Sequence, residues 1–281
     1  MTDAASPLPI DAAETDDALL SREIAGEAGR LLVALREDFG PVEPDDKVRV
    51  KELRDAADAA SHELLAARLA EARPGDAVLS EEGVDDKSRL GASRVWIVDP
   101  LDGTFEYGQG RADFAVHVVL WRTDGAVPRL AAGTVELPAQ GLTHSVLDPT
   151  VLPTSAPADR PVRLVVSRSR PPQALDDIVE SLAGRLAADG ITDRGVEIVD
   201  VGSVGAKVGE LLAGRAEAYL HDTGFYEWDL AAPLAIAQAA GCFTALPDGS
   251  AFDFNRESPW QPGIVVAVPS IAAAVKDVVL G

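Results

Sequence analysis

The sequence predicts a mixed α/β fold made of two packed subdomains. At 281 residues the chain is longer than a usual single hydrophobic core, and its 47% hydrophobic and 25% charged residues are an ordinary globular composition. Residues 77–146 read as a series of short strands, whereas residues 162–220 alternate strands with helices. The first pattern is typical of an antiparallel sheet and the second of βαβ units, so we expect two sheets.

Two helices are expected before the first strand. Apolar residues recur at helical spacing between residues 20 and 35, and a Gly-Pro pair then supplies a stop. A second apolar stripe predicts a helix over residues 53–72. Residues 1–14 are polar and are expected to form a mobile tail.

Five strand-like segments separated by turn residues then predict a largely antiparallel sheet. They lie at residues 77–79, 95–98, 114–121, 130–135 and 142–146. Residues 148–157 are rich in proline and small polar residues, which favours a subdomain junction there. The junction divides the chain into an N-terminal α+β subdomain, residues 15–155, and a C-terminal α/β subdomain, residues 156–281.

The second subdomain is expected to hold parallel strands joined by helices. Strands are expected at residues 162–166, 196–201 and 216–220, and helices at residues 175–188 and 204–212. In such folds the loops that follow the strands carry ligand-binding residues. The loops after the first two of these strands are therefore expected to line a substrate pocket.

Charge and cysteine content limit the partners and the compartment. A formal charge of −21 repels nucleic-acid backbones and anionic lipids, although a small phosphate could bind if cations screened the site. The single Cys242 cannot form an internal disulfide and is expected to fill the core. We see no signal-like N-terminus and no apolar run of about 18 residues, so the cytoplasm is the expected location. The four histidines lack metal-ligand spacing and are expected to be structural.

An apolar strand in residues 95–104 ends in two carboxylates three residues apart. Pro100 biases Asp99 toward an extended conformation and Gly103 lets the backbone reverse. Asp99, Asp102 and the Leu101 carbonyl can therefore converge on one point, where Mg²⁺ would find the oxygen ligands that it prefers. The alternative is a solvated turn in which Asp and Gly serve turn geometry only.

Two further acidic positions flank hydrophobic segments. Glu81 and Glu82 end a strand, where alternation lets one of them face the site, although a lone Glu-Glu is usually surface charge. Asp229 stands at the start of an alanine-rich helix, where it could equally be an acid that stabilises the helix N-terminus. Together with Asp99 and Asp102, these acids offer enough negative charge for two divalent metals.

These motifs resemble those of the inositol monophosphatase superfamily, whose signature is an acidic pair, an Asp-Pro-x-Asp-Gly-Thr turn and a late Trp-Asp. All three occur in order, at residues 81–82, 99–104 and 228–229. The resemblance implies a layered α/β/α/β/α sandwich of the inositol monophosphatase and fructose-1,6-bisphosphatase type. The N-terminal subdomain would then carry most metal ligands, and the C-terminal one the substrate pocket and the last ligand.

Within the superfamily the chain looks most like the actinobacterial members of the CysQ branch, on residues 73–82, 166–172 and 202–207. That branch implies hydrolysis of 3′-phosphoadenosine 5′-phosphate to adenosine 5′-phosphate and phosphate by a metal-activated water. The superfamily also implies lithium sensitivity and raises a homodimer as an option. An inositol 1-phosphate or fructose 1,6-bisphosphate phosphatase is the nearest alternative. A weakly catalytic regulatory protein that binds metal or nucleotide is an alternative of another class.

The resemblance also assigns roles residue by residue. The ligands of two or three Mg²⁺ ions would be Glu81, Asp99, the Leu101 carbonyl, Asp102 and Asp229. Glu81 would also be catalytic, and Thr104 and Asp58 would orient and deprotonate the attacking water. The segment before Asp58 lacks the threonine that commonly stands two residues earlier, so Asp55, one helical turn before it, remains an alternative.

Further residues are expected to bind the substrate. They are Gly103, Thr104, Ser167, Arg168, Ser203, Lys207 and Glu227. The backbone N–H groups of Gly103 and Thr104 would bind the reacting phosphate. Arg168 and Lys207 could contact the second phosphate, unless Arg168 and Arg170 are surface charges and Lys207 a helix-face residue. By analogy with the family, Glu227 would line the leaving-group side.

Overall fold

The computed structural model describes residues 12–281, so the expectation of a mobile tail falls mostly on residues 1–11, outside the described part. Helix α1 begins at Ala12, earlier than expected, because Ala12 to Glu14 are residues with adequate helix propensity. Helix α2 begins at Lys47 rather than near Leu53. Asp46 caps it, since its side chain accepts a hydrogen bond of 3.1 Å from the Arg49 N–H.

The described chain contains helices throughout and strands from residue 77 onward. The helices are α1 Ala12–Phe39, α2 Lys47–Ala72, α3 Thr104–Gly108, α4 Leu175–Ala188, α5 Val204–Leu212, α6 Glu227–Ala239 and α7 Ala272–Val279, with short 3-10 turns at Ser88–Gly91 and Pro138–Gln140. The strands are β1 Ala77–Ser80, β2 Arg94–Asp102, β3 Ala115–Arg122, β4 Arg129–Leu137, β5 Leu142–Ser145, β6 Val162–Ser167, β7 Val196–Val201, β8 Ala218–His221, β9 Phe225–Tyr226, β10 Phe243–Ala245, β11 Trp260–Gln261 and β12 Ile264–Ala267.

Both predicted kinds of sheet are present. The first has the order β1-β2-β3-β4-β5 and is antiparallel except for the parallel pair β1 and β2. The second has the order β10-β12-β8-β6-β7, in which β6 pairs in parallel with β7 and β8, as the βαβ pattern predicts. Its other two pairings are antiparallel. The proline-rich residues 148–157 run between the last strand of the first sheet and the first strand of the second.

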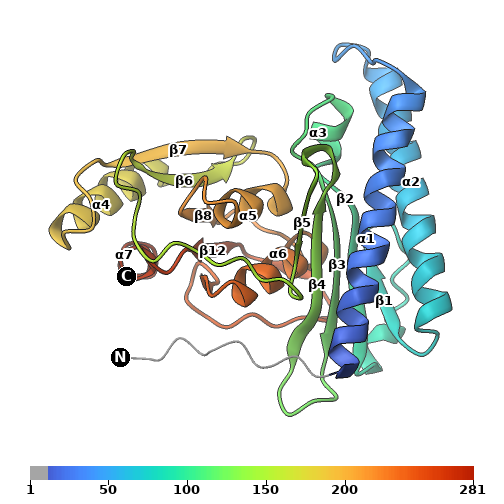
Figure 1. Cartoon of the computed structure of the whole chain (residues 1–281). Helices are drawn as coiled ribbons and strands as arrows, with labels where there is room; N and C mark the ends of the chain where they lie inside the picture. The colour runs from blue at the N-terminus through green and yellow to red at the C-terminus, as the bar shows by residue number, and fades with distance from the viewer. Residues whose placement is uncertain (1–11) are drawn as a thin grey trace.

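The elements stack in five layers (Figure 1). Helices α1 and α2 cover the outer face of the first sheet, and helices α5 and α6 lie between the two sheets. Helices α4 and α7 cover the far side of the second sheet. The predicted layered α/β/α/β/α sandwich is confirmed.

Helix α6 forms the centre of the sandwich and has almost no exposed face. Its residues from Leu230 to Ala237 are all buried. The helix approaches strand β4 closely at Gly133, where an added Cβ would lie 2.7 Å from the Cβ of Ala235. Only glycine fits at that contact, so two small residues set the distance between the helix and the first sheet.

Two of the smaller expectations can be compared with the structure. Cys242 is buried in the core, as expected, and this burial raises the pKa of its thiol to about 12. Among the helices of residues 12–281, none has both the length and the apolar character that crossing a bilayer requires.

Candidate metal centre and substrate cavity

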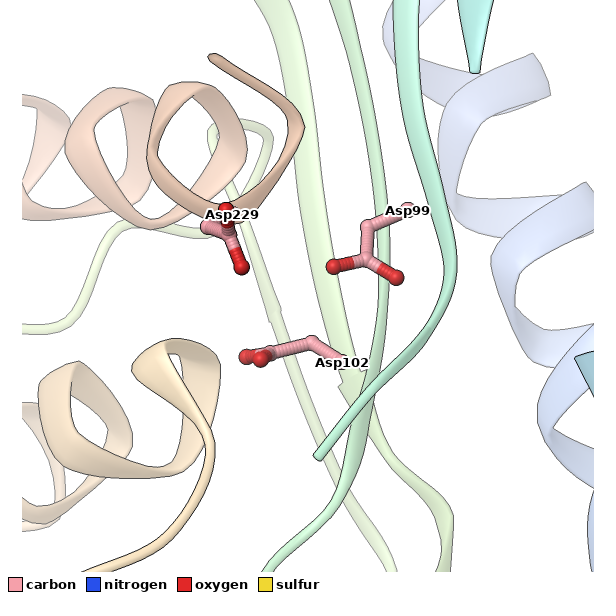
Figure 2. Close-up of side chains that lie close together, drawn as sticks. All are labelled: Asp99, Asp102 and Asp229. Atoms are coloured by element: carbon pink, nitrogen blue, oxygen red, sulfur yellow. The ribbon is translucent and has the colours of Figure 1, made fainter. Parts of the chain in front are cut away.

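Strand β2 delivers two carboxylates to one end of the first sheet. Its register with β3 shifts between the pair Asp99 and His117 and the pair Asp102 and Ala115, which marks a β-bulge. The bulge lies at the Pro100-Leu101 step, and both acids turn toward the same space (Figure 2). The local sequence thus produces the convergence that its proline and glycine predicted.

Asp229 brings a third carboxylate from helix α6, far along the chain (Figure 2). One oxygen atom from each of Asp99, Asp102 and Asp229 lies within 4.8 Å of the others. The side chain of Asp229 accepts a hydrogen bond of 2.7 Å from the Tyr226 N–H, which closes a capping box at the start of α6. The helix start therefore fixes the direction of this carboxylate.

Asp99 has a buried oxygen atom without a partner. Its Oδ1 accepts a hydrogen bond of 3.0 Å from the Leu101 N–H, whereas its Oδ2 has none, and the residue is 1% exposed. Burial, followed by the charges of Glu81 and Asp102, raises the pKa of Asp99 well above its usual range. An unpaired buried carboxylate oxygen is costly, so this atom fits the role of a ligand to a bound cation.

Asp102 is held by three neighbours on one oxygen. Its Oδ2 accepts hydrogen bonds of 2.6 Å from the Ser203 hydroxyl and 2.9 Å from the Gly205 N–H, and it lies 3.2 Å from Nε2 of His117. His117 Nδ1 lies 3.1 Å from the Trp228 carbonyl oxygen. This histidine, expected to be structural, therefore lies beside the carboxylate cluster on strand β3, and its Nε2 forms no hydrogen bond there.

Glu81 follows the last residue of β1, and the pairing of Ser80 with Val98 places it beside Asp99. Solvent reaches Glu81 from the cavity side, while Glu82 is exposed and does not line the cavity. Partial desolvation, together with the charges of Asp229 and Asp102, raises the pKa of Glu81 to about 8. Glu81 therefore lies at the edge of the carboxylate cluster and is close enough for the charges of the cluster to raise its pKa.

The donor set fits a hard divalent cation. Burial, and after it the charge of Asp102, raises the pKa of Asp229 to about 7. Crowded carboxylates that hold protons near neutral pH are stabilised when a cation replaces the protons. Every donor is a carboxylate or carbonyl oxygen, which suits Mg²⁺. The residues that could hold such ions are Glu81, Asp99, Leu101, Asp102 and Asp229.

The carboxylate cluster opens into a cavity of about 450 Å³ that both halves of the molecule line. The lining residues are Glu81, Asp99, Leu101, Asp102, Gly103, Thr104, Phe105, Glu106, Ser167, Ser169, Arg170, Gly202, Val204, Lys207, His221 and Asp229. The acids come from the end of β1, from β2 and from α6, whereas the cations come from the loop after β6 and from α5. One cavity thus has an acidic wall, Glu81, Asp99, Asp102 and Asp229, and a basic wall, Arg170 and Lys207.

Gly103 forms the turn between the acids and helix α3. Its φ of +87° lies in the left-handed region, and an added Cβ would lie 3.0 Å from the Cβ of Ser203 and 3.1 Å from the Asp113 carbonyl oxygen. Both conformation and space therefore require glycine here. Gly103 and Thr104 line the same cavity as the carboxylate cluster.

The structure places Asp58 beside Thr104. Their side chains are hydrogen-bonded, and the Thr104 hydroxyl also lies 3.1 Å from the Leu101 carbonyl oxygen. Burial, and then the charge of Glu82, raises the pKa of Asp58 to about 7. Asp55 is exposed and forms an ion pair with Lys51 on the same helix. Of the two alternatives, only Asp58 contacts Thr104.

The expected contacts of the C-terminal half divide into two groups. Ser167 and Lys207 line the cavity, and Lys207 is 2% exposed with its Nζ donating to the Gly202 carbonyl. Burial lowers the pKa of Lys207 to about 8. Arg168 does not line the cavity. Its guanidinium forms ion pairs of 3.1, 2.9 and 3.0 Å with Glu106, Asp113 and Asp200, so three carboxylates already neutralise it.

Ser203 and Glu227 also lie outside the cavity lining. The Ser203 hydroxyl caps helix α5 and donates to Asp102, so this residue contacts a candidate metal ligand instead of the cavity. Glu227 is fully buried, and its carboxylate accepts hydrogen bonds of 2.8 and 3.0 Å from the backbone N–H groups of Asn255 and Arg256. Both of its oxygens therefore accept hydrogen bonds from backbone N–H groups.

Sequence reasoning missed two residues of the cavity. Arg170 was considered only as a surface charge, yet it lines the cavity and donates to the Gly224 carbonyl over 3.2 Å. His221 lines it as well, with its ring stacked on Phe225 at 4.7 Å between centroids. Its position at the end of β8, beside the strand β6 that precedes the Ser167 loop, was the available signal.

Comparison with known proteins agrees with this architecture. The inositol monophosphatase family model matches residues 18–278. The chain is 40% identical to the 3′-phosphoadenosine 5′-phosphate phosphatase of Mycobacterium leprae over 275 residues, which cover 95% of this chain and 94% of that protein. It is 32% identical to the inositol-1-monophosphatase of the same organism, over 83% and 77% of the two chains. Among solved structures, CysQ from Bacteroides thetaiotaomicron has a TM-score of 0.66 at 25% identity and covers 90% of this chain and 97% of that one. The chain belongs to the inositol monophosphatase family.

Proposed function

We propose that this chain is a magnesium-dependent phosphatase that removes the 3′-phosphate from 3′-phosphoadenosine 5′-phosphate. The observation that carries the proposal is that one cavity is lined both by the carboxylate cluster and by two cations, Arg170 and Lys207. A substrate with two phosphate groups can place one group at the carboxylate cluster, where metal ions would bind, and the other at the two cations. A monophosphate would use only one of these two regions.

The acidic wall would hold the metal. Glu81, Asp99 and Asp102 on the first sheet, Asp229 on α6 and the Leu101 carbonyl would be the protein ligands. Magnesium ions bound there would supply positive charge for the reacting phosphate and lower the pKa of a bound water. The same charge would offset the acidity of the chain, so an anionic substrate could enter despite a net charge of −21.

Thr104 and Asp58 would prepare the water. In the structure the Thr104 hydroxyl donates its single proton to the Leu101 carbonyl oxygen over 3.1 Å. With that carbonyl bound to a metal ion, the proton would instead point to Asp58, which leaves the hydroxyl lone pairs free to accept a hydrogen bond from water. A carboxylate with a pKa of about 7 suits a general base at neutral pH. The water proton would pass to Asp58 as the new bond to phosphorus forms and the bond from phosphorus to ribose O3′ breaks. The leaving O3′ would take a proton from a solvent water, and Asp58 would return its proton to solvent before the next turnover.

The N–H groups of Gly103 and Thr104 would hold the reacting phosphate, and the basic wall would hold the 5′-phosphate. Burial lowers the pKa of the Lys207 ammonium group, but a pKa of about 8 keeps most of the group protonated at pH 7. Arg170 is permanently charged and can offer two parallel N–H groups to a phosphate. Ser167 lies at the same wall and could donate a further hydrogen bond.

The relatives support the nucleotide over the other phosphates. The protein named as a 3′-phosphoadenosine 5′-phosphate phosphatase is 40% identical to this chain, and the one named as an inositol-1-monophosphatase is 32% identical. Both share the fold, so the substrate must be distinguished by the cavity. The two cations facing the acids favour the bisphosphate.

The test is phosphate release from 3′-phosphoadenosine 5′-phosphate, inositol 1-phosphate and fructose 1,6-bisphosphate, measured with and without Mg²⁺. The wild type and Asp99→Asn are compared side by side. We expect Mg²⁺-dependent release with a strong preference for the nucleotide, abolished in the variant. Preference for inositol 1-phosphate or the sugar would overturn the substrate, and release from none of the three would favour the regulatory alternative.

A further inference from the structure

A buried arginine joins two segments that carry candidate metal ligands. Arg89 lies in the loop after Glu81 and is 2% exposed. Its Nε and Nη2 donate to Asp85 over 3.0 and 2.8 Å, and its Nη1 donates to Oδ1 of Asn255 over 2.7 Å. Asn255 returns a hydrogen bond of 3.0 Å from its Nδ2 to the Arg89 carbonyl. Two segments 166 residues apart in sequence are thus joined by reciprocal hydrogen bonds.

The contacts continue from Asn255 to the start of helix α6. The Asn255 N–H donates over 2.8 Å to Glu227, which is fully buried and is the first residue of α6. Glu227 precedes Asp229 by two positions. A continuous path therefore runs from the loop after Glu81, through Arg89, Asn255 and Glu227, to the helix turn that carries Asp229.

The backbone at this junction is held in an uncommon conformation. Within residues 12–281, the non-glycine residues with positive φ are Lys87, at 68°, and Asn255, at 60°. Both belong to the junction, since Lys87 also donates over 2.8 Å to the Glu257 carbonyl. Left-handed conformations of non-glycine residues persist where surrounding contacts hold them, and they concentrate at functional sites.

Glu81 is the candidate ligand that most needs outside support. Asp99 and Asp102 share strand β2, and the capping box orients Asp229. Glu81 lies outside the three-carboxylate cluster, and it is followed by a loop without regular structure up to Ser88. One side of Glu81 is fixed by the pairing of β1 with β2, and the other side only by this loop.

We propose that Arg89 is a positioning residue for the metal centre. Through Asn255 and Glu227 it holds the loop after Glu81 against the start of α6, so that Glu81 completes the oxygen set of Asp99, Asp102 and Asp229. The inference rests on the metal centre of the proposed function and is independent of the substrate. Residues that orient metal ligands typically change metal affinity by roughly 10–100-fold when mutated.

The test is a Mn²⁺ titration followed by electron paramagnetic resonance, without substrate, on wild type, Arg89→Met and Asn255→Gly. Glycine accepts the positive φ of position 255 and keeps the backbone N–H that binds Glu227, so this variant removes only the side-chain bonds to Arg89. Val84→Ala is the matched control, because Val84 lies in the same loop and is 99% exposed. We expect Arg89→Met and Asn255→Gly to weaken Mn²⁺ binding about tenfold or more, and Val84→Ala to leave it unchanged.

A merely structural role would give a different pattern. Unaltered Mn²⁺ affinity and stoichiometry in folded Arg89→Met and Asn255→Gly would overturn the inference, even if their melting temperatures fell. If Arg89→Met does not fold, Asn255→Gly alone decides. Wild-type protein that binds no Mn²⁺ would overturn the metal centre and the inference together. Wild-type protein that binds Mn²⁺ but releases no phosphate would count against the proposed function only, and the variants would still decide the role of Arg89.

Discussion

The two walls of the cavity are built in different ways. The acidic wall places carboxylates at the ends of regular elements, where sheet pairing and a capping box fix their directions. The basic wall places Arg170 in an exposed loop, where it donates to the Gly224 carbonyl. Lys207 lies within a buried helix, donates to the Gly202 carbonyl and lies 5.6 Å from the centre of the Tyr219 ring. Regular elements therefore fix the carboxylates on the side where a metal would act, whereas the side where a substrate would be selected includes an exposed loop.

This contrast predicts that changes in the acidic wall affect the chemical step and changes in the basic wall affect substrate binding. Asp99→Asn should have the largest effect, a loss of at least about 10³-fold in kcat, since metal ions supply several kcal/mol to the transition state. The free energy of unfolding of the metal-free protein should not fall, because the amide removes an unpaired buried charge. Phosphate release and thermal unfolding measure the two effects, and substantial turnover in the variant would contradict the assignment.

Asp58→Asn should lower kcat by about 10²-fold, the lower range for loss of a general base. The wild-type rate should rise as the pH passes the Asp58 pKa of about 7, and the variant should lack this rise. Asp55→Asn is the control, because Asp55 is exposed on the same helix and pairs with Lys51. An Asp55 variant that loses activity while the Asp58 variant keeps it would reverse the assignment. The measurement is a rate profile against pH at saturating Mg²⁺.

Arg170→Ala should raise KM for 3′-phosphoadenosine 5′-phosphate by about 10-fold to 100-fold and leave kcat nearly unchanged. The range corresponds to about 1.5–3 kcal/mol for a hydrogen bond to a charged group. The KM for adenosine 3′-phosphate, which lacks the second phosphate, should rise much less. Arg168→Ala provides the matched control, since Arg168 does not line the cavity and three carboxylates already pair with its guanidinium. An equal rise in KM for both substrates would show that the basic wall does not bind the second phosphate.

The smallest effect concerns stability in the absence of metal. Folding raises the pKa of Glu81 to about 8 and those of Asp229 and Asp58 to about 7, so the folded state retains protons that the unfolded chain has released by pH 5. Their stabilisation is complete at low pH and is lost as the pH rises through 7 and 8. The melting temperature of the metal-free protein should fall by a few degrees between pH 6.5 and 8.5. Unfolded histidine, with a pKa of about 6.5, opposes this trend only at the start of the window.

Magnesium should reverse this trend, because bound cations replace the protons that the carboxylates lose. The increase in melting temperature on adding Mg²⁺ should therefore be larger at pH 8.5 than at pH 6.5. Asp99→Asn should show little response to Mg²⁺ at either pH. A metal-free melting temperature that rises with pH over this window would contradict the charge repulsion described for the acidic wall.

Regular elements could be predicted where the signal is local. The expected helices over residues 175–188 and 204–212 agree with α4 and α5, and the strand over 196–201 agrees with β7. The start of α2 was missed because its apolar stripe is weak in the first turns, and the cap at Asp46 carries the information instead. Helix starts depend on single side-chain hydrogen bonds, which periodicity does not reveal.

In the candidate site, too, residues with a local sequence signal could be predicted and residues without one could not. Asp99, Asp102 and Asp229 could be predicted because each lies in a short motif at the end of an element, and the structure brings them together. Arg168 and Arg170 could not be distinguished by alternation, since the Arg170 N–H donates to the Ser167 hydroxyl oxygen over 3.2 Å and turns the chain. The partners of Arg168 come from distant segments such as Asp113, which no local pattern reports.

The close contact between Gly133 and Ala235 has a consequence for how such a cavity can change its width. Helix α6 carries Asp229 and is spaced from the first sheet, which carries the other acids, by residues as small as glycine and alanine. A single added methyl group at this contact would push a whole layer outward, and with it one edge of the metal centre. We therefore expect the cavity width to change through paired substitutions at this buried contact, in which one residue becomes larger and the other smaller. Such pairs should change the width more than substitutions of the residues that contact the substrate.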